Sequence, residues 1–542
     1  MKLDAAVIGA GHDGLAAAAL LAARGGRVAV FEARSEPGGL AAVEEFHPGF
    51  RAPGVLPDGA RLAPGAARAL SLESYGLRWE SEPEPVYVPE PGGPGLLLSA
   101  DAGRARVELE ERRPGEGRRY AAWRGFLDEV RGYAQTLISQ RPPAIDPRGR
   151  AQLLELLRAG MGLVGLGERT MTELLRVGPM CAADWLREWL EDELLQAGLA
   201  AGTLPGNPGG PWAPGTAVPL LLAECGAEGA VQGGPAALTE LLVRCAEAQG
   251  ARLQTGSRVA SLRVEDGRVR GLVLADGTDV DAPLVLSAAD PRATLLELLP
   301  PGWLPLRVER GLRRIRARGT TAVLWLALSE LPPFAGRPGA RIAHARLVRT
   351  LDDLERTADA LKYDRLVLGP PKRGRRRRRP GELDEARLRG PWLELGIPSL
   401  GRPGLAPEGA HVLVVHAHGV PESPAPATRR AAAGWTDARR RDLRKYVLAA
   451  LEEVLPGLGE TVQEVRVLTP PDLAAAYGIP GGHLHHAEPA LDQLWALRPI
   501  PACARYATPV EGLFLCGGGS HPGAAFRCGA GVLGAGAALA AS

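Results

Sequence analysis

The chain opens on two short apolar runs separated by a Gly-rich turn and an Ala-rich stretch. The apolar residues 4–8 predict a first strand, and the Ala-rich residues 15–24 predict a helix. Residues 27–31 are rich in valine and predict a second strand, which Glu32 follows directly. A strand, a helix and a second strand in this order predict a βαβ unit, and therefore an α/β fold with a doubly wound, Rossmann-like parallel sheet.

This α/β pattern is interrupted twice. Residues 60–225 are Leu-rich with Pro and Gly breaks, and they predict helices that cover a substrate cavity, at 124–137, 152–163 and 183–199. Residues 292–478 predict an antiparallel sheet with helices beside it, from strands at 321–328 and 411–416 and an amphipathic helix at 435–454. Between the two interruptions the α/β pattern returns, with a helix at 235–249 and β-rich runs at 252–262, 268–274 and 284–287. Asp-Gly turns at 265–267 and 275–277 join these runs.

The turn between the first strand and the first helix carries the sequence Gly9-Ala10-Gly11-His12-Asp13-Gly14. In a βαβ unit the first glycine permits a tight turn, the second lets the backbone approach a pyrophosphate, and the third lets the helix pack closely on the sheet. The helix N-terminus then offers free N–H groups to the phosphates. Glu32 is placed to accept hydrogen bonds from a ribose and would repel a 2′-phosphate. An adenosine diphosphate group with a free ribose is the expected ligand.

The same glycine spacing recurs at 160–165 and at 529–534, but neither copy lies in a βαβ context. The first follows a helical pattern, and the second leaves only a short tail. After Glu32 the chain continues through Ala33 and Arg34 to Gly38-Gly39. An acidic residue followed by a short spacer and two glycines favours a flavin nucleotide over a nicotinamide nucleotide.

Composition agrees with a large enzyme of two domains. The 542 residues exceed the size at which a single core stops growing, and 45% are hydrophobic. The formal net charge of +2 gives no reason to expect nucleic acid as a partner. Six cysteines form neither a CxxC pair nor a zinc spacing, so we expect free thiols and a reducing, cytoplasmic compartment. No apolar run is long enough for a membrane span, and the Arg-rich stretch 372–380 leaves a peripheral membrane contact open.

Several of these segments together resemble the phytoene desaturase-like flavoproteins, and within them the pyridine nucleotide-disulphide oxidoreductase domain-containing protein 2 group. The N-terminal part of the resemblance lies in residues 9–15, 32–39 and 43–50. It resumes at Gly233-Gly234, in the strand 258–262 and at 287–291, and it is strongest near the end, at 481–486, 491–494, 498–499 and 512–523. The resemblance implies an FAD-binding domain built from residues 1–75, 226–300 and 480–542. The inserted α+β substrate domain then comprises residues 76–225 and 301–479.

The resemblance and the glycine loop together give a set of expected FAD-binding residues: Gly9, Ala10, Gly11, Asp13, Gly14, Glu32, Ala33, Arg34, Gly38, Gly39, Val259, Gly517, Pro522, Gly523 and Gly531. The family's terminal glycine cluster is altered here, because residues 524–528 read Ala-Ala-Phe-Arg-Cys, and side chains there are expected to crowd a flavin. The family name mentions disulphides, but without a CxxC pair we expect no dithiol chemistry.

A flavin accepts hydride at its own ring, so the protein needs to bind, orient and handle protons. His486, His521 and Arg527 are the candidate catalytic residues, with the two histidines as proton carriers. For each histidine a structural hydrogen-bonding role remains the alternative, and for Arg527 the alternative is an ion pair. Three histidines at 483, 485 and 486 lack supporting carboxylate or cysteine ligands, so no metal site is expected.

Three hypotheses follow. The first is an FAD-dependent dehydrogenase or desaturase that takes hydride from a C–H bond of a small apolar molecule and passes electrons to oxygen or a quinone. The second is an amine-oxidase-like flavoenzyme, which lacks a candidate for the lysine that this group usually places beside the flavin. The third is a flavin-fold protein without turnover, acting as a regulator or scaffold. Substrate identity and oligomeric state, including a homodimer, stay open.

Overall fold

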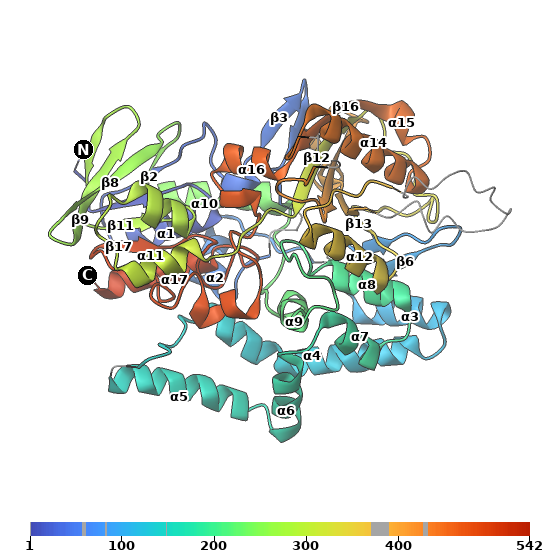
Figure 1. The fold of residues 1–542 in the computed structure, drawn as a ribbon, viewed down its shortest axis with the longest axis horizontal. Coiled ribbons are helices and arrows are strands. Elements are labelled where there is room, and N and C mark those ends of the chain that lie inside the picture. The colour runs from blue at the N-terminus through green and yellow to red at the C-terminus, as the bar shows by residue number, and fades with distance from the viewer. Residues whose placement is uncertain are drawn as a thin grey trace.

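The computed structural model describes residues 2–541 apart from 57–60, 82–83, 148, 370–389 and 427–431. A five-stranded parallel sheet forms the first of two large β structures (Figure 1). Its strands, in spatial order, are β17 (Leu513–Leu515), β11 (Val285–Ser287), β1 (Ala5–Ile8), β2 (Val28–Phe31) and β7 (Arg252–Gln254). The sheet therefore combines strands from the start, the middle and the end of the chain, as the sequence predicts.

Helices cover one face of this sheet. They are α1 (His12–Ala22), α10 (Gly234–Ala248) and α17 (Gly529–Ala541). Four consecutive alanines of α1, residues 16–19, are almost fully buried, which lets the neighbouring helices approach closely. The opposite face packs against a three-stranded antiparallel sheet and α11 (Leu306–Arg313). The strands of that small sheet are β8 (Val259–Glu265), β9 (Arg268–Leu274) and β10 (Asp279–Asp281).

The predicted β-rich run 252–262 divides between two sheets, because β7 joins the parallel sheet and β8 joins the antiparallel one. The turn from β8 to β9 is confirmed. Asp266 and Gly267 both have positive φ, 51° and 74°, as a tight hairpin turn with the twist of its strands requires.

The second large β structure is a seven-stranded sheet, on the right in Figure 1. Its order is β16 (Val462–Leu468), β12 (Thr321–Leu328), β15 (His411–His418), β14 (Trp392–Gly396), β13 (His344–Leu347), β5 (Val86–Val88) and β6 (Leu96–Leu98). All neighbours pair antiparallel except β13 and β5. The outer face packs against α14 (Asp437–Val454) and α15 (Leu458–Thr461). The antiparallel substrate-domain sheet is thus confirmed.

Helices from residues 102–225 form the lower part of the molecule in Figure 1, with α5 at the lower left. They are α3 (Ala102–Arg112), α4 (Glu116–Ser139), α5 (Arg150–Val164), α6 (Glu168–Val177), α7 (Ala182–Trp189), α8 (Glu193–Ala201) and α9 (Ala217–Cys225). The single helix predicted at 183–199 is wrong. It breaks before Asp192, whose side chain accepts the Leu195 N–H (2.8 Å) as the N-cap of α8, while the Glu116 carboxylate accepts the Glu191 and Asp192 N–H groups.

The remaining elements are the hairpin β3 (Glu44–His47) and β4 (Phe50–Ala52), and the helices α2 (Ala66–Ala69), α12 (Leu351–Lys362), α13 (Pro398–Gly401) and α16 (Pro470–Tyr477). The six cysteines are buried and unpaired, as expected. Across the described residues, none of the helices has the length and apolar character that a membrane span needs. The Arg-rich stretch 372–380, for which the sequence leaves a peripheral membrane contact open, lies outside the described residues.

Candidate functional site

The glycine loop between β1 and α1 combines one tightly packed glycine with one open glycine. Gly9 has a φ of +92°, which L residues rarely adopt. A Cβ atom at Gly14 would lie 2.0 Å from the Gly9 carbonyl oxygen, so this position requires glycine for packing. At Gly11, by contrast, a Cβ atom would meet nothing within 4 Å. Gly11 precedes the free N–H groups of α1, so this open space is available to an anionic group.

The turn at Gly38-Gly39 lies directly on this loop. The Gly38 N–H donates to the Ala10 carbonyl oxygen (2.8 Å), and a Cβ atom at Gly39 would lie 3.3 Å from the Gly11 Cα atom. Both glycines have positive φ, and a Cβ atom at Gly38 would lie 2.9 Å from the Ala42 backbone nitrogen. Gly38 and Gly39 thus contact the glycine loop through backbone atoms, and the absence of side chains at these two positions keeps the loop accessible to a nucleotide.

Glu32 lies at the carboxyl end of β2, next to the glycine loop. It is 7% exposed, and its two carboxylate oxygens accept the N–H groups of Ala10 (2.7 Å) and Arg34 (3.0 Å). Each oxygen keeps a second lone pair for another donor. The Ser257 N–H donates to the Glu32 carbonyl oxygen (2.7 Å), which brings the start of β8, and with it Val259, to this side of the sheet. The residues that sequence reasoning selected for a nucleotide therefore adjoin one another in space.

The N-terminus of α17 meets the N-terminus of α1 at Asp13. The Gly531 N–H donates to Asp13 Oδ1 (3.1 Å), and a Cβ atom at Gly531 would lie 2.1 Å from the Asp13 carbonyl oxygen. Burial raises the pKa of Asp13 to about 6, although the hydrogen bond from Gly531 and the positive charge of Arg527 both act to lower it. Gly531 is thus required for the contact between the two helices, and Asp13 links them.

Arg498 joins two loops at the carboxyl edge of the parallel sheet. It is 2% exposed, and its guanidinium donates to the carbonyl oxygens of His485 (2.6 Å), Gly518 (2.8 Å) and Ser520 (3.3 Å). Burial lowers the pKa of Arg498 to about 10, so it stays charged at neutral pH. The predicted residues Gly517, Pro522 and Gly523 belong to one of these loops, and Gly517 packs against the Ala288 backbone after β11.

The altered segment 524–528 is fastened to residues 61–63. The Arg527 N–H donates to the Arg61 carbonyl oxygen (3.1 Å), and the Ala63 N–H donates to the Arg527 carbonyl oxygen (3.0 Å). Phe526, which was expected to crowd a cofactor, packs in the core, with its ring beside Gly226 at the end of α9. The buried Arg527 guanidinium donates to the Ala524 carbonyl oxygen within its own segment.

His486 pairs with a buried carboxylate that the sequence analysis did not assign. Its Nδ1 atom lies 3.4 Å from Oδ2 of Asp290, which follows β11 and is 1% exposed. Arg292 approaches the other oxygen of Asp290, at 3.1 Å. Although burial opposes it, the neighbouring His486 ring and the hydrogen-bonded Arg292 side chain lower the pKa of Asp290 to about 2. A permanently ionised Asp290 therefore holds the His486 ring, an arrangement suited to orienting a proton carrier.

His521 and Arg527 have different neighbours from His486. The His521 ring is buried against the carbonyl groups of Leu137, Ile138 and Gln140 at the end of α4, and burial lowers its pKa to about 4. Its backbone carbonyl accepts the Tyr506 hydroxyl (3.0 Å). The His521 ring thus lies among carbonyl groups at the end of α4, whereas the His486 ring lies beside a carboxylate.

His483 is buried and neutral. Its Nε2 lies 2.7 Å from the Gly206 carbonyl oxygen and its Nδ1 accepts the His485 N–H (3.1 Å), so the proton belongs on Nε2. Burial lowers the pKa of His483 to about 4, from 6.5. Because the folded state disfavours protonation of His483, the contribution of the neutral His483 ring to folding stability is fully present above pH 6.5. It is lost as the pH falls toward about 4.

Acidification is therefore expected to remove about 3 kcal/mol of the free energy of unfolding through His483 alone. The measurement is urea unfolding at a series of pH values in this range. His483→Gln keeps a donor for Gly206 but does not titrate, so its unfolding free energy should fall less steeply with acid. An identical pH dependence in both proteins would contradict the burial of a neutral imidazole here.

Polar side chains gather on the inner face of the seven-stranded sheet, and sequence reasoning missed them. Arg346 Nε lies 3.0 Å from the Glu394 carboxylate, and His418 Nε2 lies 3.5 Å from it. His418 Nδ1 in turn lies 2.9 Å from the Thr321 hydroxyl. Although burial opposes it, Arg346 and His418 keep the pKa of Glu394 well below its usual range. The available signal was the alternation in β15, where His416 and His418 occupy one side of an otherwise apolar strand.

A narrow gap, too tight to hold a water molecule, lies where the domains and the helical region meet. It is lined by Pro205, Gly206, Thr320, Thr321 and residues 482–485. Thr321 is the last of the buried polar side chains just described, next to His418. Residues 482–485 directly precede His486. The arrangement therefore brings the buried polar chain and the His486 loop to one place.

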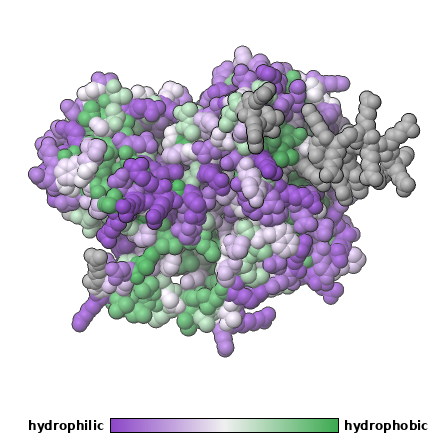
Figure 2. All heavy atoms as spheres, in the orientation of Figure 1, coloured by the Kyte–Doolittle hydropathy of each residue, from purple (hydrophilic) through white to green (hydrophobic). Residues whose placement is uncertain are grey.

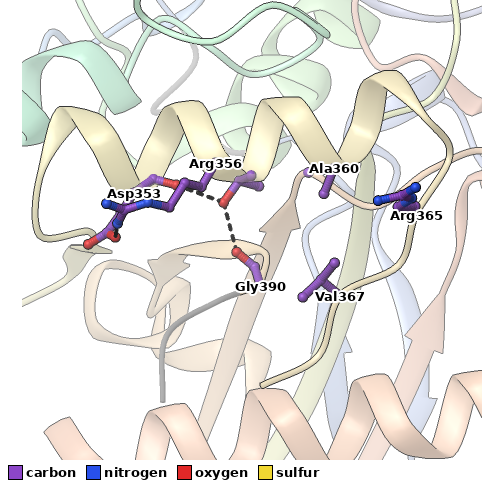
Figure 3. Close-up of a pocket in the computed structure, with 8 residues that line it drawn as sticks. Asp353, Arg356, Ala360, Arg365, Val367 and Gly390 are labelled. Atoms are coloured by element: carbon purple, nitrogen blue, oxygen red, sulfur yellow. Dashed lines mark hydrogen bonds and ion pairs between the residues drawn. The ribbon is translucent and has the colours of Figure 1, made fainter. Parts of the chain in front are cut away.

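Figure 3 shows a larger cavity, of about 290 Å³, elsewhere in the substrate domain. It lies beside α12, where Asp353 and Arg356 form an ion pair (2.7 Å) and the Thr357 hydroxyl donates to the Gly390 carbonyl oxygen (2.9 Å). Among the described residues, its lining includes none of the predicted cofactor or catalytic residues. No group of histidine, cysteine and carboxylate side chains suited to a metal ion occurs in the described part of the chain.

Comparisons with known proteins agree with this geometry. Residues 7–69 match the NAD(P)-binding Rossmann-like domain family. The chain is 31% identical to pyridine nucleotide-disulfide oxidoreductase domain-containing protein 2 of Rattus norvegicus, over 96% of this chain and 90% of that protein. It is 26% identical to the neurosporene-forming phytoene desaturase of Cereibacter sphaeroides, over 96% of this chain and 91% of that enzyme.

Solved structures share the fold at lower identity. Cyclohexylamine oxidase from Brevibacterium oxydans has a TM-score of 0.54 at 15% identity, covering all of this chain and 99% of the oxidase. Putrescine oxidase bound to putrescine has a TM-score of 0.55 at 15% identity over the same shares of the two chains. These likenesses confirm the α/β architecture with its inserted antiparallel sheet.

Proposed function

Since this chain belongs to the family of pyridine nucleotide-disulfide oxidoreductase domain-containing protein 2 and is an oxidoreductase with a Rossmann-like nucleotide domain, we propose that it holds FAD and removes hydride from a C–H bond of a small substrate. The observation that carries the proposal is the open space at Gly11, enclosed by backbone from Gly38-Gly39 and adjoining the Glu32 carboxylate. A buried acid at the ribose position favours a nucleotide without a 2′-phosphate.

The residues present fit this cofactor. The Gly11 loop and the α1 N-terminus bind the pyrophosphate, Glu32 the ribose, and the loop 517–523 lies at the carboxyl edge of the same sheet, where such cofactors extend. FAD supplies the hydride acceptor when bound. Asp13 and Arg527 place a negative and a positive charge near the point where the N-termini of α1 and α17 meet. The altered segment 524–528 is compatible with this placement, because Phe526 is used in the core.

The remaining task of the protein is to position substrate and handle its proton. The Asp290 carboxylate holds His486 Nδ1, which leaves the other ring nitrogen to exchange a proton with a bound molecule. Arg498 fixes the backbone of the preceding residue, His485, and so fixes the His486 loop. The proposed final electron acceptor would be oxygen or a quinone. The substrate that the resemblance favours is apolar.

A specific observation favours a second candidate, a substrate with an amine or alcohol group. The inner face of the sheet presents Thr321, backed by His418 and Glu394, at the narrow domain-boundary gap, which has to widen to admit such a substrate. A wall built only for hydrocarbon would not need buried ionised groups, which are costly unless they are paired. None of the described lysines, Lys2, Lys362 and Lys445, lines this gap, so the amine chemistry would not use them.

Anaerobic mixing distinguishes the two candidates. Phytoene in detergent, putrescine, cyclohexylamine and a secondary alcohol are each added to the flavin-loaded protein, and the absorbance of oxidised flavin is followed. We expect one class to bleach the band. Bleaching by phytoene supports the apolar substrate. Bleaching by an amine or alcohol that is lost in Thr321→Val but kept in Thr321→Ser supports the polar one. A loaded protein that no compound reduces would favour the role without turnover.

A further inference from the structure

Exposed apolar side chains are concentrated on one helical arm. Twelve large hydrophobic residues are exposed in the described chain, and eight of them lie between residues 145 and 175. α5 contains no buried residue at all. Figure 1 shows α5 and α6 extending along the lower edge of the molecule, and Figure 2 shows hydrophobic side chains gathered along that edge. Such a concentration marks an interaction surface rather than ordinary surface variation.

One side of α5 is held by the rest of the molecule. The Glu155 carboxylate lies 2.8 Å from the Arg505 guanidinium of the nucleotide domain, and a Cβ atom at Gly162 would lie 3.3 Å from the Tyr133 ring of α4. The partly covered residues recur at helical spacing, at Gln152, Glu155, Ala159 and Leu163. The helix is therefore fixed in orientation by its inner side.

Six exposed apolar residues lie on the outer side of α5, and Leu153 and Leu156 flank the four that we define as the seam, namely Leu154, Leu157, Met161 and Val164. Their exposed fractions are 51%, 52%, 63% and 66%. The spacings of three, four and three residues are those of the a and d positions of a coiled coil. Helices that lie in a membrane surface carry a strongly charged polar side rich in Lys and Arg beside their apolar face. The only basic residues of α5 are Arg150 and Arg158, and its inner polar side is used within the molecule, through Glu155, so we favour another helix over lipid as the partner of the seam.

We propose that the seam of α5 docks antiparallel on the seam of a second copy of this chain. The alignment that sets Leu157 against Met161 of the second copy also sets Leu154 against its Val164, so every seam residue gains an apolar partner. The same alignment brings Arg150 to the carboxyl end of the second copy's α5, just before Glu168. There the helix dipole and the Glu168 carboxylate are both negative, so the charges are complementary at each end.

The interface is self-complementary, as a two-fold dimer requires. A seam of one short helix is small compared with the interfaces of permanent dimers. The dimer is therefore expected to form at high protein concentration and to dissociate on dilution.

Sedimentation equilibrium of the full chain over a wide concentration series tests the proposal. The wild type should pass from monomer to dimer, and Leu157→Glu with Met161→Glu should weaken the dimer at least about a hundredfold. The matched control is Leu306→Glu, which changes a residue 59% exposed on α11, away from the seam, and should dimerise like the wild type. Circular dichroism confirms that each variant is folded. A wild type that stays monomeric throughout, or seam variants that dimerise normally, would overturn the proposal.

A charge exchange tests the antiparallel alignment itself. Arg150→Glu alone should weaken the dimer, and Arg150→Glu combined with Glu168→Arg should restore it. Failure of the double variant to recover would overturn the alignment. Flotation with vesicles of phosphatidylcholine and phosphatidylglycerol tests whether the seam binds lipid instead of a second copy. If a monomeric wild type floats with the vesicles and the seam variant does not, the seam binds lipid and the second-copy proposal is wrong.

Discussion

Gly11→Ala is expected to fold normally and to lose its FAD. The added methyl group meets no protein atom within 4 Å, and the φ of −72° at this residue suits alanine, so neither packing nor backbone opposes the change. The methyl group does occupy the space where the loop backbone would approach a pyrophosphate. We expect FAD to bind at least about a hundredfold more weakly, which corresponds to about 3 kcal/mol.

The measurement is FAD titration of the apoprotein, followed by fluorescence, together with thermal unfolding of the apoprotein. Gly125→Ala is the matched control, because it also adds a methyl group in open space, on α4. It should bind FAD like the wild type. Unchanged FAD binding in Gly11→Ala would mean that the pyrophosphate lies elsewhere.

Arg498→Met is expected to cost about 3 to 5 kcal/mol of the free energy of unfolding, because a buried charged donor with several partners is lost. Methionine fills much of the same space but leaves the carbonyl groups of His485, Gly518 and Ser520 without this donor. Those residues belong to the two loops that we assign to the active site. The variant should therefore also lose FAD more readily than the wild type.

Urea unfolding of the two apoproteins measures the loss. Arg313→Met is the control, since the Arg313 side chain is 64% exposed and pairs with Glu309 one helical turn away on α11. Such a surface pair contributes less than about 1 kcal/mol. An Arg498 variant as stable as this control would show that the two loops hold together without the guanidinium.

The nucleotide-binding loop could be predicted because its signals are local. Gly9, Gly11, Gly14 and Glu32 act through the strand, turn and helix in which they occur, so their spacing is sufficient to locate them. The hairpin at Asp266-Gly267 is similar, since positive φ in two successive residues selects these residue types. The architecture follows from the order of such elements.

The polar parts of the candidate site depend on contacts between residues far apart in the chain. Asp290 and His486 are distant in sequence and meet only because the end of β11 and the loop before β17 share one edge of the sheet. Arg346, Glu394 and His418 come from three neighbouring strands, and their pairing needs the register of the sheet. The exposure of α5 could not be seen either, because its periodicity resembles that of a helix covered by its own chain.

The absorbance spectrum of the freshly purified protein, followed by denaturation and identification of the released cofactor, tests the central claim most directly. The account predicts an oxidised-flavin band at near-stoichiometric occupancy, with FAD as the released molecule and no covalent attachment. Colourless protein that also fails to take up added FAD would contradict it, and would mean that the open loop at Gly11 does not serve a flavin nucleotide.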